Sequence, residues 1–119
     1  MDNPLKGEVG FDAAGQRWRM VFGPDAMAAL EAHFDESMTE MSARISAHIR
    51  VGDLMAFIWA GLMKLHPEVT AEAVRGLVYE VGVGVMVDKV ATAWRGAFST
   101  EEEAPKPARP RKRAAAGTG

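Results

Sequence analysis

The sequence predicts an α+β fold in which an N-terminal β-hairpin packs on a bundle of four to five α-helices. Apolar residues alternate with polar ones through the first part of the chain, and from Pro24 to Phe98 they recur at helical spacing. Period two is typical of half-buried strands, and spacings of three and four are typical of amphipathic helices. After Phe98 no large apolar side chain remains. We therefore divide the chain into a folded domain, residues 1–98, and a tail, residues 99–119.

Two alternating runs joined by a short glycine-containing connection indicate the hairpin. Their apolar members are Val9, Phe11, Trp18, Met20 and Phe22. A lone hairpin is barely stable in water, so we expect this one to lie on the helices. Gly23-Pro24 ends the second strand and begins a helix, because proline lacks the N–H of a ladder but has the φ angle of a first helical turn.

The first helical region carries an interruption at Asp35-Glu36. Its apolar positions are Met27, Leu30 and Phe34 before the interruption, then Met38, Met41 and Ile45 after it. Ser37 and Glu40 have the spacing of a capping box, in which each side chain accepts a hydrogen bond from the other residue's backbone N–H. The pattern leaves two short helices or one bent helix open.

Residues 54–63 contain no charged or strongly polar side chain, and Asp53 is placed to cap their start. Ten such residues are too few to cross a bilayer, so they predict a buried central helix, which His66-Pro67 ends.

Two further helices are expected after Pro67. Thr70 can cap the first of them, and Gly82 suits its C-terminal end. The apolar positions of this helix are Val74, Leu77, Val78 and Val81. The alternation from Val83 to Val87 would also suit a strand, but the longer spacing through Val90, Trp94 and Phe98 predicts a helix over residues 83–98.

Composition and charge exclude several function classes. The chain has no cysteine, which excludes disulfides, thiolate catalysis and cysteine-ligated zinc. Residues 1–98 carry 9 basic and 13 acidic side chains, whereas residues 99–119 carry 5 and 3. The acidic balance of the domain argues against a nucleic-acid-binding face on it. The N-terminus lacks a basic flank and an apolar core, so we expect no secretion signal.

No motif indicates catalysis. The three histidines, His33, His48 and His66, have no metal-ligand spacing, and no carboxylate pair stands out for acid–base work. Gly82-Val83-Gly84 lacks the continuation of a phosphate-binding loop. We therefore expect a protein that is not an enzyme and that needs no cofactor or metal.

Methionine, with 8 residues in 119, suggests a binding function instead. Methionine side chains adapt to varied apolar partners. Core filling is the competing interpretation for each methionine, and the more common one. The candidate partner-binding residues are Met27, Phe34, Met38 and Met41, with Met38 and Met41 favoured because their short helix is the least hydrophobic.

The tail is basic and rich in proline. Its candidate electrostatic contacts, with phosphates or an acidic partner, are Lys106, Arg109, Arg111, Lys112 and Arg113. It has no aromatic residue for base stacking and follows three consecutive glutamates, which favours a solvated tail over a nucleic-acid element. Its composition predicts disorder.

Several local strings occur in a set order along residues 3–98. They are Asn3-Pro4-Leu5-Lys6-Gly7-Glu8-Val9, the Gly15-centred hairpin, Phe22 to Leu30, Leu54, Trp59-Ala60-Gly61-Leu62, His66-Pro67, the Thr70-to-Val81 helix, Trp94-Arg95 and Ala97-Phe98. As an ordered set they resemble the small tail-assembly chaperones of gene transfer agents and related siphophage-like tails, sometimes labelled tail tube proteins. No single string is diagnostic, and the family offers no catalytic residue to carry over.

The resemblance implies a cytoplasmic protein of the bacterial cell that acts during particle assembly. It would bind the tape-measure protein, keep it soluble and help recruit tail tube subunits. A structural component retained in the particle tail is the first alternative, and a small DNA-associated regulator acting through the basic tail is the second. A membrane partner is not expected, a nucleic-acid partner is disfavoured, and a homo-oligomer is left open.

Overall fold

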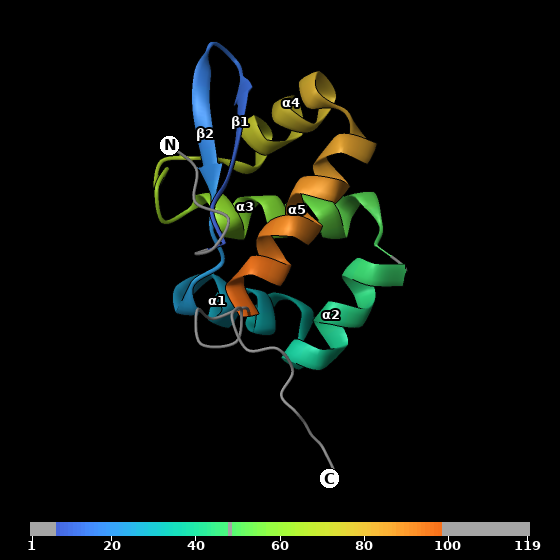
Figure 1. The fold of residues 1–119 in the computed structure, drawn as a ribbon. Helices are drawn as coiled ribbons and strands as arrows, with labels where there is room; N and C mark the ends of the chain where they lie inside the picture. The colour runs from blue at the N-terminus through green and yellow to red at the C-terminus, as the bar shows by residue number, and fades with distance from the viewer. Residues whose placement is uncertain (1–6, 48, 99–119) are drawn as a thin grey trace, which may run out of the picture.

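The computed structural model describes residues 7–47 and 49–98, which form a two-stranded antiparallel sheet and five helices. The elements are β1 (Val9–Ala13), β2 (Gln16–Met20), α1 (Pro24–Phe34), α2 (Met38–Ala47), α3 (Val51–Leu62), α4 (Ala71–Val81) and α5 (Val83–Phe98). This architecture confirms the α+β prediction of a hairpin on a helical bundle (Figure 1). The tail and its five candidate cations lie outside the described residues.

The α3 helix lies at the centre of the fold and packs against α1, α4, α5 and β2 (Figure 1). Leu54, Phe57, Ile58 and Leu62 are completely buried, so the prediction of a buried central helix is confirmed. The expected cap is wrong, because α3 begins at Val51 and not after Asp53. The Asp53 carboxylate instead accepts a hydrogen bond of 3.3 Å from the backbone N–H that precedes the helix.

The hairpin has the predicted buried face, since Phe11, Trp18 and Met20 all point into the core. Its turn consists of Ala14 and Gly15, both in the left-handed region, with φ of 52° and 74°. Two residues with positive φ make the turn whose twist matches that of the flanking strands. At its tip, the Ala14 N–H donates to a carboxylate oxygen of Glu80 in α4, at 2.9 Å.

The outer edge of β2 is covered by the chain around the end of α3. The N–H of Arg19 donates to Nε2 of His66 at 3.1 Å, and the Trp18 and His66 rings lie 4.7 Å apart. Through these two contacts, His66 joins the hairpin to the α3–α4 connection.

The first helical region forms two helices and not one bent helix. Asp35 ends α1 in the left-handed conformation, and Ser37 and Glu40 form the predicted capping box, with bonds of 2.8 and 3.1 Å. Arg44 of α2 then bridges the Glu36 and Asp53 carboxylates, with 2.8 Å to Asp53. These acceptors raise the pKa of Arg44 above its usual value. The bridge joins the α1–α2 connection to the start of α3.

The ends of α4 follow the sequence signals. The Thr70 hydroxyl accepts from the Ala73 N–H at 3.0 Å, and Gly82 ends the helix with φ of 104°. The segment after Gly82 is helical throughout, as the longer apolar spacing predicts.

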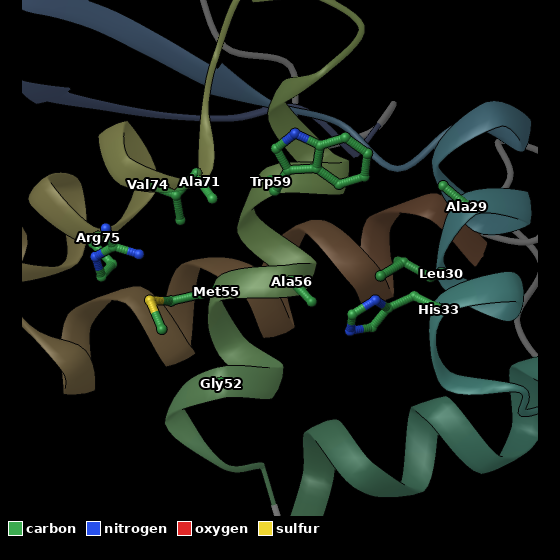
Figure 2. Close-up of a pocket in the computed structure, with 10 residues that line it drawn as sticks. All are labelled: Ala29, Leu30, His33, Gly52, Met55, Ala56, Trp59, Ala71, Val74 and Arg75. Carbon is green, nitrogen blue, oxygen red and sulfur yellow. The ribbon is translucent and has the colours of Figure 1, made fainter.

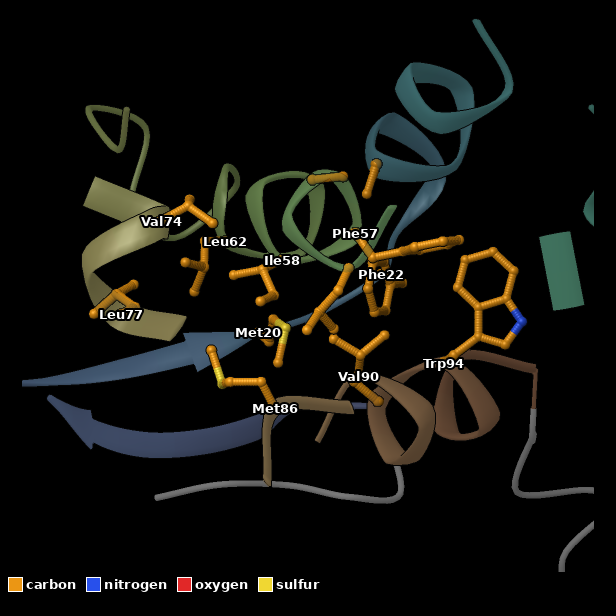
Figure 3. Packing of buried hydrophobic residues seen from close by; sticks show 14 of the residues in the cluster. Met20, Phe22, Phe57, Ile58, Leu62, Val74, Leu77, Met86, Val90 and Trp94 are labelled. Atoms are coloured by element: carbon orange, nitrogen blue, oxygen red, sulfur yellow. The ribbon is translucent and has the colours of Figure 1, made fainter. Parts of the chain in front are cut away.

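A cluster of aromatic rings joins the hairpin, α3 and α5. Phe22, Phe57 and Trp94 meet edge to face, with ring centroids 5.3–6.3 Å apart (Figure 3). The indole N–H of Trp94 donates to the Ser42 hydroxyl at 2.8 Å. Within the described residues no polar or charged side chain is buried, so this core rests on apolar packing.

Candidate functional site

An apolar groove runs along the outer side of α3, between α1 and α4. Its first hollow, of about 280 Å³, has Met55, Ala56 and Trp59 of α3 as its floor. Leu30 and His33 of α1 form one wall, and Val74 and Arg75 of α4 form the other (Figure 2).

A second hollow, of about 380 Å³, continues the groove along α3 and α4. The two hollows share Met55 and Arg75. The second hollow adds Val51 from the start of α3 and Tyr79 from α4. We call the two hollows together the α3 groove.

The α3 groove gathers much of the exposed apolar surface. Seven large hydrophobic side chains are exposed among the described residues, and four of them line this groove. These four are Val51, Trp59, Tyr79 and Val83, with Trp59 39% and Tyr79 93% exposed. A rimmed apolar concentration of this kind is typical of a surface that another molecule covers.

Among the described residues, the one charged side chain that lines the groove is Arg75, a cation in a chain whose formal net charge is −2. No aspartate or glutamate lines either hollow, whereas Arg75 lines both and His33 lines the first. Within the part of the chain that the structure describes, the Arg75 guanidinium has no ion pair or hydrogen bond. Arg75 is therefore an unpaired cation beside the apolar floor of the groove.

None of the four candidate residues predicted from the sequence lines this groove. Met27, Phe34 and Met38 are half-buried and pack against the core. Met41 is completely buried, so its side chain does not reach the surface of this fold, because α2 turns it toward the interior. Whether any of the four contacts a partner stays a prediction, as does a DNA contact through the tail.

The sequence signal for the groove is a stripe of apolar residues in α3, which the abundance of methionine does not by itself indicate. Val51, Met55 and Trp59 follow one another at intervals of four, which places them in one stripe along α3, roughly opposite the completely buried Phe57. A helix that is apolar on every side must be covered on every side. Because α1, α4, α5 and β2 do not cover it completely, one stripe of α3 remains partly exposed.

The described histidines form no catalytic arrangement. His33 lies edge to face with Phe34, His66 accepts the Arg19 N–H, and His48 falls outside the described residues. Across residues 7–47 and 49–98 there is no group of three or more metal-ligating side chains. None of the described helices has the length and apolarity required to cross a membrane.

Residues 6–100 match the sequence model of a family described as phage tail tube protein, GTA-gp10. The chain belongs to this family. The match spans the hairpin and all five helices of this tail protein, and so includes the whole of the α3 groove. It confirms the resemblance to a phage and gene-transfer-agent tail family. No curated protein and no solved structure matches the chain.

Proposed function

We propose that this tail-family protein is a tail-assembly chaperone that binds the tape-measure protein, keeps it soluble and helps to recruit tube subunits. The observation that carries the proposal is the α3 groove, an apolar surface on a small helical domain of a phage-tail family. It acts by binding, without catalysis.

Groove binding suits a chaperone because it is reversible. An amphipathic helix lays its apolar face into such a groove, and each contact of this size is weak by itself. Many copies along one long partner would cover its apolar surface together. Incoming tube subunits can then displace the copies one at a time.

A structural tail component is the competing function, and the family description favours it. A ring-forming subunit needs two different complementary patches, because each subunit contacts its neighbours head to tail. Among the described residues, the exposed large apolar side chains gather mainly in one groove. One dominant surface supports the capture of one kind of partner.

Co-expression with the tape-measure protein of the same particle tests the proposal. The soluble fraction of the tape-measure protein should rise severalfold over co-expression with an unrelated acidic protein of similar size. The Phe57→Ala chain serves as a destabilised control that should not raise this soluble fraction, since loss of a fully buried ring costs about 3–5 kcal/mol of folding stability. A soluble fraction no higher than with the unrelated protein would refute the chaperone function.

A further inference from the structure

We infer that the α3 groove takes one amphipathic helical segment of its partner, with a carboxylate of that segment paired to Arg75. The inference rests on the proposed function in naming the tape-measure protein as this partner. The chemistry of the segment follows from the lining of the groove alone.

The groove walls require a helix and not a strand. Its floor and walls are the helices α1, α3 and α4, whose interior backbone groups are already hydrogen-bonded within each helix. An extended segment would find no ladder partners there, and its N–H and C=O groups would lose water without replacement. A helix satisfies its own backbone and presents only side chains.

The length of the floor suits about two helical turns. Val51 and Trp59 lie eight residues apart on α3, which is about 12 Å along the axis. Three apolar side chains at i, i+3 or i+4, and i+7 of a partner helix span nearly the same length. Met55, at the middle of the stripe, has the flexible side chain that tolerates different apolar partners.

Arg75 sets the charge of the partner. A helix in the groove would cover both hollows, and Arg75 lines both. Covering a guanidinium that has no acceptor costs free energy, so the favoured occupant supplies one. With no acidic side chain in the lining, that acceptor comes from the partner.

The chain's own tail does not meet these requirements. Residues 99–119 include Glu101–Glu103 but no large apolar side chain, so they cannot fill the hollows. A second copy of the chain is the remaining competitor, and sedimentation of wild type and Trp59→Ala distinguishes it from a partner helix.

The test uses overlapping 20-residue peptides that span the tape-measure protein, each labelled with fluorescein and titrated with the full chain. The bound peptides should be amphipathic and carry an acidic residue beside their apolar face. The Arg75→Glu chain should bind them about tenfold more weakly, and replacing that acidic residue by lysine should restore binding to this variant. Equal binding by wild type and Arg75→Glu would overturn the inference.

Two controls lie outside the groove. Lys64→Glu makes the same charge change at an exposed site that lines neither hollow, and it should leave binding unchanged. Leu65→Ala is the control for Trp59→Ala, because the two side chains are 41% and 39% exposed. Only Trp59→Ala should weaken binding, and far-ultraviolet circular dichroism should show both variants folded.

The outcomes separate the inference from the proposed function. If Arg75→Glu and Trp59→Ala solubilise the tape-measure protein as wild type does, the inference fails and the chaperone function stands. Suppose instead that the lysine-substituted peptides regain binding to Arg75→Glu, but the intact tape-measure protein gains no solubility. The proposed function then fails and the inference about the groove stands. A homodimer in sedimentation that Trp59→Ala dissociates would overturn the inference in favour of a second copy.

Discussion

The backbone N–H of Val21 donates to the carbonyl of Gly61 across 2.8 Å, joining the end of the hairpin to the last turn of α3. The last four carbonyls of a helix have no partner within it. The Trp59 and Leu62 carbonyls are bound by N–H groups that follow α3, and the Gly61 carbonyl is bound by the hairpin. The hairpin thus stabilises the end of the helix that carries the floor of the groove.

Alanine at Gly61 should destabilise the fold, whereas alanine at Gly76 should stabilise it. A Cβ on Gly61 would lie 2.6 Å from Cγ of Met20, and overpacking of this kind costs about 1–3 kcal/mol. Gly76 is exposed in α4 with open space around it, so Gly76→Ala should gain about 0.5–1 kcal/mol from helix propensity. Urea unfolding of both variants measures these changes, and a shift of the same sign in both would contradict the packing described.

Asparagine at Ala14 should stabilise the hairpin. Ala14 holds φ of 52°, a conformation that costs an ordinary L-residue about 1–2 kcal/mol and that asparagine adopts more readily. Asparagine followed by glycine is also the preferred pair for this turn. Ala14→Asn should therefore raise the free energy of unfolding by about 0.5–1 kcal/mol. A loss of stability in urea unfolding would mean that the turn has another conformation.

Removal of the Arg44 guanidinium should loosen α2 from the start of α3. Arg44→Met should lower the thermal unfolding midpoint, because the Glu36 and Asp53 carboxylates would face each other without the cation between them. Arg44→Lys should recover only part of the loss, since an ammonium lacks the fork that reaches both carboxylates. Arg50→Met is the control at an exposed position, and an equal shift there would argue against the bridge.

The features that the sequence predicted well depend on local signals. The capping box at Ser37 and the cap at Thr70 need only neighbouring residues, and both are present. The predicted start of α3 is wrong because an aspartate can cap a helix from either of two positions. It can be the N-cap residue itself, or, as Asp53 does, it can lie in the first turn and accept a hydrogen bond from the backbone N–H of the N-cap residue. Only the packed structure distinguishes these two positions.

The candidate site was harder to predict, because it depends on how the helices cover one another. Met41 and Met55 are both methionines on the apolar faces of predicted helices. Met41 is nevertheless enclosed in the core, whereas Met55 forms part of the floor of the groove. Burial of a methionine is decided by neighbours far away in the chain. The unused cation at Arg75 likewise becomes visible only once its surroundings are known.

As a chaperone, the chain would act on the tape-measure protein during assembly and then leave. The most direct measurement is its copy number in purified tail-bearing particles, relative to the major tube subunit, by quantitative mass spectrometry. For a chaperone we expect far less than one copy per ring of tube subunits. A fixed stoichiometric amount, such as one copy for each tube subunit, would contradict it and make the chain a structural part of the tail.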